Sequence, residues 1–170
     1  NPTPLYTPRL MDYKNFYLIL APMRLIPLHN LQLLSRITPE RQAELAAQVS
    51  AEGGTVEFFN GVSEAEYHER LDQAVALVTG SRDEGFGIPL VESMNRGVPV
   101  VVSNIEIFKE IGGDAAIFFE ADDAQDFANA VKKLESNPEW IAASKKSIRQ
   151  AEKFNWDRSA GDLIEMVGRL

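Results

Sequence analysis

Short apolar runs of β-type residues alternate with segments of helical periodicity along this 170-residue chain. Several of the runs are apolar at every position, as a parallel sheet that is covered on both faces requires. Strands that alternate with helices favour right-handed β-α-β crossovers. The sequence therefore predicts an α/β fold with a doubly wound, mainly parallel, six-stranded sheet. The expected strands are residues 5–7, 30–34, 56–59, 75–79, 98–102 and 116–119.

Helix candidates fill the intervals between these strands, and capping residues mark several of their ends. Thr38 precedes Pro39 as an N-cap before a first-turn proline, and Ser63 precedes an acidic first turn. Glycines follow two of the segments, as helix C-termini favour. The expected helices are residues 16–25, 39–49, 64–73, 89–96, 107–111 and 124–134, followed by two helices within 138–170 that break around Phe154-Asn155-Trp156. Together they predict one Rossmann-like domain over residues 1–170.

Composition excludes several classes of function. The chain has no cysteine, which excludes disulfides, thiol nucleophiles and cysteine-based metal sites. Its apolar runs are far shorter than the roughly 18 residues that span a bilayer, and its net charge of −8 argues against nucleic acid as a partner. No basic and apolar leader opens the sequence. Because the chain begins with Asn1 rather than Met, we expect it to be a piece of a longer protein.

The charge is unevenly distributed between the beginning of the chain and the rest. Residues 1–50 carry an excess of cations, so the remaining residues carry more than the whole net negative charge. A locally basic segment on an acidic body suits a small anionic ligand, although a solvated acidic surface that serves solubility is an alternative. The cations of this segment are Arg9, Lys14, Arg24, Arg36 and Arg41, and its acids are Asp12, Glu40 and Glu44.

The loop that follows the strand at 75–79 carries the richest chemistry. Gly85 and Gly87 remove Cβ atoms where a ligand could approach the backbone. We expect Pro89 at the first helical position, which would leave the N–H groups of Ile88, Leu90 and Val91 free at a helix N-terminus that attracts phosphate. The alternative is an ordinary glycine-containing turn.

Two carboxylates flank this helix start. Glu84 lies in the loop before the glycines, and Glu92 lies eight positions later, inside the helix. A carboxylate accepts paired hydrogen bonds from vicinal hydroxyls, as in sugars and ribose. One carboxylate on each side of a phosphate-binding helix end would hold a sugar–diphosphate–nucleoside at both ends. The alternative is that Glu84 caps locally and that Glu92 is a solvated helix residue.

Other sites fit the sequence less well. A dinucleotide fingerprint needs a third glycine where Leu90 stands, and the phosphate-loop ending Gly-Lys-Ser/Thr is missing. These absences argue against an NAD-linked oxidoreductase and a nucleoside triphosphatase. We interpret His29 and His68 as surface residues, and we expect no metal at the acidic stretch Glu120-Ala121-Asp122-Asp123.

The segment Glu84-Gly85-Phe86-Gly87-Ile88-Pro89-Leu90-Val91-Glu92 resembles the Glu-x7-Glu motif of retaining glycosyltransferases with the two-domain GT-B fold. More narrowly, it is similar to the signature of the group 1 family. The resemblance continues at Val56-Glu57-Phe58-Phe59-Asn60-Gly61-Val62-Ser63, Gly97-Val98-Pro99-Val100-Val101, Glu110, Gly113-Asp114-Ala115-Ala116 and Phe154-Asn155-Trp156. It implies that residues 1–170 form the C-terminal, donor-binding domain, and that the N-terminal acceptor domain is absent from this chain.

The resemblance also implies roles for individual residues. Arg9-Leu10-Met11-Asp12-Tyr13-Lys14-Asn15 is similar to the family's basic pair, so Arg9 and Lys14 would hold the donor diphosphate and stabilise the leaving group. Glu84 would contact the donor sugar, the backbone of Gly85, Phe86, Gly87, Ile88, Pro89 and Leu90 would hold sugar and phosphate, and Glu92 would bind the ribose. Arg9, Lys14 and Glu84 would be the catalytic set. Base contacts are expected near residues 60–63.

The function that the resemblance implies is transfer of a hexose from a UDP- or GDP-sugar to a glycan, lipid or small acceptor, as in polysaccharide biosynthesis. No cofactor or metal is expected, and the isolated domain is not expected to act alone. The full-length protein is expected in the cytoplasm, with peripheral contact at the inner face of the membrane as an option. The chain departs from the family at Pro8, Ser35-Arg36 and Lys109. Pro8 and Ser35-Arg36 favour the alternative of a non-catalytic binding or assembly module.

Overall fold

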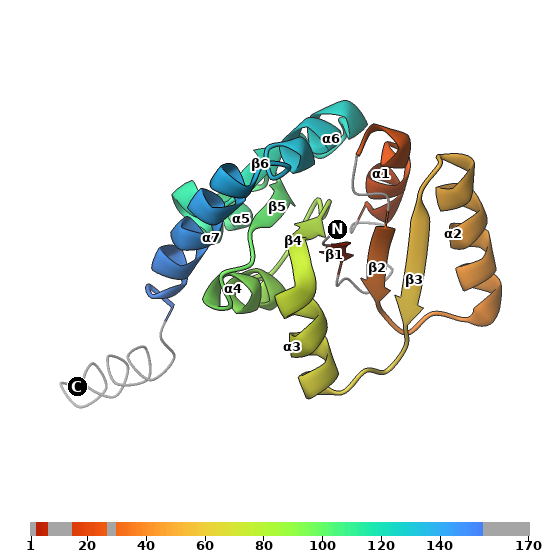
Figure 1. The fold of residues 1–170 in the computed structure, drawn as a ribbon, viewed down its shortest axis with the longest axis horizontal. Coiled ribbons are helices and arrows are strands. Elements are labelled where there is room, and N and C mark those ends of the chain that lie inside the picture. The colour runs from red at the N-terminus through yellow and green to blue at the C-terminus, as the bar shows by residue number, and fades with distance from the viewer. Residues whose placement is uncertain (1–2, 7–14, 27–29, 155–170) are drawn as a thin grey trace.

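The computed structural model describes residues 3–6, 15–26 and 30–154. Its strands form one six-stranded sheet in the order β3-β2-β1-β4-β5-β6, and every pair is parallel (Figure 1). The strands are β1 (Thr3–Tyr6), β2 (Asn30–Leu34), β3 (Thr55–Phe59), β4 (Ala74–Thr79), β5 (Val100–Ser103) and β6 (Ile117–Phe119). The predicted α/β, doubly wound, parallel sheet is therefore confirmed.

Strand β5 begins two residues later than the sequence predicts, and β6 begins one residue later. We expected a strand over 98–102, but β5 starts at Val100. The N–H of Val98 donates to the carbonyl of Ser93 at 3.0 Å, which closes the turn after the preceding helix. Pro99 has no N–H to donate, and only its carbonyl joins the sheet, accepting from the N–H of Leu77 at 2.9 Å.

The helices are α1 (Phe16–Leu20), α2 (Pro39–Ala51), α3 (Glu64–Gln73), α4 (Ile88–Asn95), α5 (Glu106–Gly112), α6 (Ala124–Lys132) and α7 (Asn137–Ala151). Two short 3-10 turns accompany them, η2 (Met23–Leu25) and η3 (Gly113–Ala115). Both predicted N-caps are confirmed: Thr38 accepts from the N–H of Arg41, and Ser63 forms a reciprocal capping box with Glu66.

The single helix predicted over 16–25 is wrong, because the chain divides there into α1 and η2. Pro22 has no N–H to continue the helical hydrogen-bond ladder, so the last bond of α1 runs from Ala21 N–H to the Tyr17 carbonyl at 3.0 Å. The predicted helix over 124–134 also ends early, at Lys132. The second helix expected near the C-terminus lies outside the described residues.

The core forms on both faces of the sheet, as the continuous apolar runs predict. On β4, Val75 and Val78 contribute to a cluster with side chains of α1, α2 and α6, whereas Leu77 contributes to a second cluster with α4 and α5. A smaller cluster joins α3 to the sheet through Leu71 and Ala74. Figure 1 shows the helices on either side of the strands. This burial on both faces fixes the position of β4. The loop with Glu84 follows the end of β4, and helix α4 with Glu92 follows that loop.

Candidate functional site

The strand order reverses direction between β1 and β4, which are neighbours in the sheet but distant in sequence. In doubly wound sheets, ligands bind at this switch point, outside the carboxyl ends of the strands. Apart from the base contacts expected near residues 60–63, the predicted site residues follow these two strands in the sequence, with Glu84 in the loop after β4 and Glu92 in helix α4 (Ile88–Asn95). Arg9 and Lys14 follow β1 in the sequence and lie outside the described residues, whereas the loop after β4 is described in full.

Asn15 shows how closely the two loops approach each other. It precedes α1 in the left-handed conformation, with φ of 49°, and its side-chain amide donates to the carbonyl of Ala121 after β6. A Cβ atom on Gly80 would lie 3.1 Å from the Asn15 carbonyl oxygen. The end of the connection from β1 to α1 therefore lies directly against the start of the loop that carries Glu84.

Gly87 shapes the start of α4. Its φ is +80°, and an added Cβ would lie 3.0 Å from Cε1 of Phe108 on α5, so both the backbone and the space favour glycine. The helix begins at Ile88, which makes Pro89 its second residue rather than its first as predicted. The N–H of Leu90 is also not free, because it donates to the Gly87 carbonyl at 2.9 Å.

Glu84 is held by a buried serine of its own loop. The Ser81 hydroxyl donates to Glu84 Oε1 at 3.0 Å, and the Thr79 hydroxyl lies 3.1 Å from the same serine oxygen. Ser81 is completely buried, and the Ser103 hydroxyl at the end of β5 donates to its carbonyl. The sequence analysis assigned Ser81 no role, although a hydroxyl three residues before a carboxylate is a recognisable local hydrogen-bond spacing.

Glu92 is held by a residue of a different helix. The Tyr67 hydroxyl of α3 donates to Glu92 Oε2 at 3.0 Å, and both side chains are half-buried. Burial raises the pKa of the Tyr67 phenol far above its usual value, and the negative charge of Glu92 raises it further. Tyr67 is therefore a protonated donor at neutral pH. Glu92 is therefore partly buried and hydrogen-bonded. Tyr67 was missed because nothing in the sequence pairs it with a residue 25 positions away.

The other predicted residues of this region occupy distinct positions. Gly85 and Ile88 are exposed, and the Phe86 ring packs edge-on against Phe154 with centroids 6.2 Å apart. The side-chain amide of Asn60 makes reciprocal hydrogen bonds of 3.0 and 3.1 Å with the backbone of Ile37. This pair joins the loops after β2 and β3, near the positions expected to contact the base.

Several residues that the sequence analysis noted lie away from this arrangement or outside the described chain. Arg36 is exposed, and Lys109 pairs with Glu106 on α5 at 2.7 Å. His68 is half-buried rather than a surface residue, with its ring centroid 5.5 Å from that of Tyr67. Pro8 and His29 fall outside the described residues.

The acidic stretch after β6 has structural partners. Asp122 pairs with Arg82 at 2.6 Å, and Asp123 caps α6 by accepting from the N–H of Asp126 at 2.9 Å. Within the described ranges, no group of three or more His, Asp or Glu side chains could hold a metal ion. No helix among the described residues is long and apolar enough to cross a membrane.

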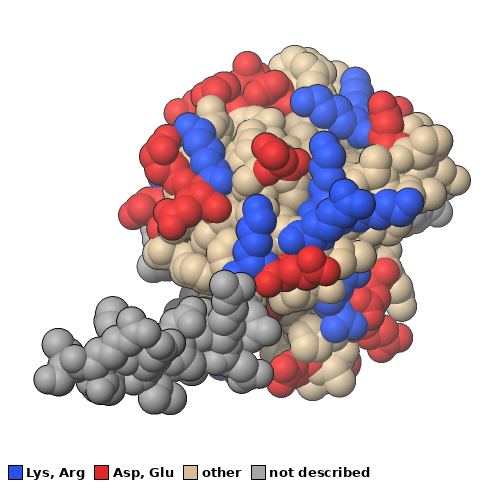
Figure 2. Space-filling model, turned by 90° about the vertical axis from the view of Figure 1, so that its left-hand side faces the viewer, with Lys and Arg blue, Asp and Glu red and all other residues tan. Residues whose placement is uncertain are grey.

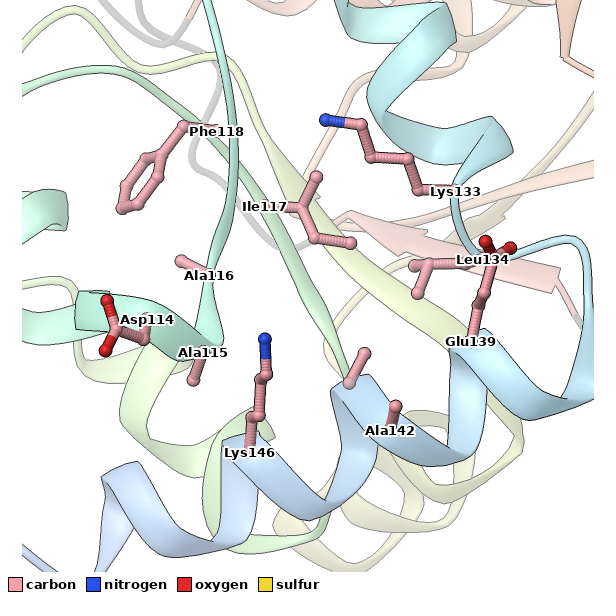
Figure 3. Close-up of a pocket in the computed structure, with 11 residues that line it drawn as sticks. Asp114, Ala115, Ala116, Ile117, Phe118, Lys133, Leu134, Glu139, Ala142 and Lys146 are labelled. Atoms are coloured by element: carbon pink, nitrogen blue, oxygen red, sulfur yellow. The ribbon is translucent and has the colours of Figure 1, made fainter.

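A groove of about 550 Å³ lies elsewhere, between β6, the end of α6 and α7 (Figure 3). Lys133 and Lys146 line it, and none of its lining residues belongs to the predicted site. Figure 2 shows Lys and Arg side chains gathered on this face of the molecule. The exposed cations of α6, its C-cap and α7 include Lys132, Lys133, Lys145, Lys146 and Arg149. The net charges of residues 1–50 and of the remaining residues did not reveal this second basic region, because neighbouring acidic residues cancel its charge in the sum.

The fold and the paired glutamates define a Rossmann-like half of a GT-B glycosyltransferase. The family model "Glycosyl transferases group 1" matches residues 1–154, so the chain belongs to that family. It is 34% identical over 109 residues to the O-antigen chain mannosyltransferase RfbU of Salmonella typhimurium, covering 64% of this chain and 31% of the relative. It is 31% identical over 100 residues to the serotype-specific mannosyltransferase WbdA of Escherichia coli, covering 58% of this chain and 12% of the relative.

Solved structures share the fold at low sequence identity. Anabaena Alr3699/HepE in complex with UDP aligns with a TM-score of 0.86 at 19% identity, over 100% of this chain and 49% of that chain. The catalytic domain of cholesterol-alpha-glucosyltransferase from Helicobacter pylori aligns with a TM-score of 0.75 at 19% identity, over 91% of this chain and 100% of that chain. The chain spans less than a third of the length of the two mannosyltransferases that it matches.

Proposed function

We propose that this chain is the donor-binding domain of a retaining hexosyltransferase that uses a UDP- or GDP-sugar. The observation that carries the proposal is the pair Glu84 and Glu92, which lie on either side of the helix start at Gly87, beyond the carboxyl end of β4. Each carboxylate accepts a hydrogen bond from its own hydroxyl donor, Ser81 or Tyr67. The names of RfbU and WbdA favour mannose as the hexose. The UDP complex of the HepE structure supports a nucleotide as the ligand.

The proposed chemistry places opposite charges along the donor. Glu84 and Glu92 accept hydrogen bonds from sugar and ribose hydroxyls at the two ends, and the N-terminus of α4 faces the phosphates. Arg9 and Lys14 stabilise the negative charge that develops as the diphosphate leaves. The position of Asn15 against Gly80 supports this assignment, because Lys14 is the residue immediately before Asn15. No metal is required in this scheme, so EDTA is expected to leave donor binding unchanged.

The acceptor and the partner domain are part of the proposal for the whole protein. A glycan, lipid or small acceptor would bind a second, N-terminal domain, and this chain alone would bind donor without transferring sugar. The O-antigen in the name of RfbU favours a growing glycan as the acceptor, within polysaccharide biosynthesis. We propose a cytoplasmic location, with peripheral contact at the inner membrane face where the acceptor is lipid-linked.

Calorimetric titration of UDP and GDP into the chain tests this proposal. We expect one of the two to bind with a dissociation constant below the millimolar range, and the matching nucleotide-sugar to bind as well. If neither nucleoside diphosphate binds at millimolar concentration, the donor-binding proposal is wrong and a non-catalytic module becomes the better description. Titration of AMP serves as a control for unspecific binding of a nucleotide anion.

A further inference from the structure

Tyr67 makes the one hydrogen bond that the described residues offer to the Glu92 side chain. Its hydroxyl lies 3.0 Å from Glu92 Oε2, and no described residue donates to Oε1. We propose that Tyr67 is a positioning residue: by holding one carboxylate oxygen of Glu92, it keeps the other available for a ribose hydroxyl of the bound nucleotide. This inference rests on the proposed function, because it assumes that Glu92 binds ribose.

Tyr67 is itself held firmly enough to act in this way. The capping box between Ser63 and Glu66 fixes the start of α3, and the Tyr67 N–H donates to the Ser63 carbonyl at 2.9 Å. The ring packs against the cluster of buried residues that joins α3 to the sheet, which includes Leu34 and Leu71. The phenol therefore reaches Glu92 from a rigid element rather than from a mobile loop.

A second contact between the same two helices makes the role of the hydroxyl separable from helix packing. Arg96, just after α4, forms an ion pair with Asp72 of α3, in which its Nε and Nη2 atoms donate to the two carboxylate oxygens of Asp72. This pair and the apolar contacts of the Tyr67 ring remain when only the hydroxyl is removed. The hydroxyl can therefore be tested without dismantling the junction of α3 and α4.

The advantage of this arrangement is preorganisation. A free glutamate side chain loses rotamer freedom when it binds a ligand, and this loss weakens affinity. Because the Tyr67 phenol is protonated at neutral pH and donates to Glu92, the carboxylate is already oriented before the nucleotide arrives. Only ligands that present a ribose hydroxyl can benefit from this orientation.

The test compares Tyr67→Phe with the unaltered chain by calorimetry, using UDP or GDP, whichever binds, and its 2′,3′-dideoxy counterpart. We expect the ribonucleoside diphosphate to bind about three- to tenfold more weakly to the variant, the usual effect of losing one hydrogen bond. Binding of the dideoxy analogue should not change. In a Glu92→Ala background, Tyr67→Phe should cause no further loss.

Two matched variants act as controls. Tyr17→Phe makes the same chemical change at a hydroxyl that contacts Arg41, and Asp72→Asn loosens the junction of α3 and α4 without touching Glu92. Both should leave nucleotide binding unchanged. Three results would overturn the role of Tyr67 but leave the proposed function standing. They are an equal loss of dideoxy-analogue binding in Tyr67→Phe, the same loss of diphosphate binding in Asp72→Asn, and no loss of diphosphate binding in Tyr67→Phe. Failure of the unaltered chain to bind either diphosphate would overturn the proposed function and this role together.

Discussion

The two glutamates of the site are held in place by different means. Glu84 accepts a hydrogen bond from Ser81, three residues earlier in the same loop, whereas Glu92 accepts one from Tyr67, on a helix 25 residues earlier. The sugar side of the proposed site is thus organised by local sequence, and the ribose side by one hydrogen bond between α3 and α4. Loss of the Ser81 hydroxyl should therefore affect sugar recognition, and loss of the Tyr67 hydroxyl should affect nucleotide recognition.

The largest effect is expected from removing the carboxylates themselves. Glu92→Ala should weaken binding of the nucleoside diphosphate about ten- to hundredfold, because hydrogen bonds to a charged acceptor are lost. Glu84→Ala should leave the nucleoside diphosphate unaffected and weaken binding of the nucleotide-sugar. Calorimetry with both ligands measures the difference. Equal losses for both variants with both ligands would contradict the division into a sugar side and a ribose side.

Gly87 tests whether the helix start between the two glutamates depends on its backbone. Gly87→Ala places a side chain at φ of +80° and within 3.0 Å of Phe108, and should cost about 1–2 kcal/mol of unfolding free energy. Gly85→Ala is the matched control, since nothing lies within 4 Å of the added Cβ and its φ is not in the left-handed region. Denaturant unfolding measures both variants. An equal change at the two glycines would argue against a special backbone at Gly87.

Ser81→Ala tests the local side of the comparison. It removes the donor to Glu84 and leaves the Thr79 hydroxyl without its partner, so stability should fall by about 1 kcal/mol. Binding of the nucleotide-sugar should weaken about three- to tenfold, with the nucleoside diphosphate unchanged. Thr79→Val provides the control, because the Thr79 hydroxyl contacts the Ser81 hydroxyl but not Glu84. A loss of diphosphate affinity in Ser81→Ala would show that the two sides are not separate.

The smallest effect is a pH dependence of stability at the junction of α3 and α4. The hydrogen bond from Arg96 holds the pKa of Asp72 below its usual value, so the folded state favours the ionised form. This contribution is present at neutral pH and is lost as the pH falls through the lowered pKa of Asp72. Urea unfolding at pH 7 and near pH 3 should show that the stability difference between Asp72→Asn and the unaltered chain is smaller at the lower pH. A pH-independent difference would contradict this assignment.

The sequence predicted what depends on periodicity and local spacing. The alternation of strands and helices was enough to predict the parallel sheet. The helix N-caps could be predicted from Thr38 and Ser63 and the residues that follow them. The contact of Tyr67 with Glu92 was not predictable in this way, because it exists only once α3 packs beside α4. The interruption at Pro22 differs, because the residue without an N–H is visible in the sequence although apolar residues continue on both sides of it.

The position of the site within the fold could be determined only from the structure. The residue pattern placed Arg9 and Lys14 after one strand and Glu84 and Glu92 after another, but it did not show that β1 and β4 are neighbours. That adjacency brings Asn15 against Gly80 and makes the two loops parts of one edge. The groove beside β6, with Lys133 and Lys146, likewise appears only when α6 and α7 are placed together.

The central claim is that the edge formed by the loop after β4 binds the donor nucleotide. Amide chemical-shift mapping by NMR, with UDP and GDP added to the labelled chain, tests this claim most directly. We predict shifts at Gly85, Gly87 and Glu92 and at Asn15, with the amides of Ile117 and Phe118 in the groove unchanged. Shifts that gather at the groove instead, or saturating nucleotide without any shift at the loop after β4, would contradict the account.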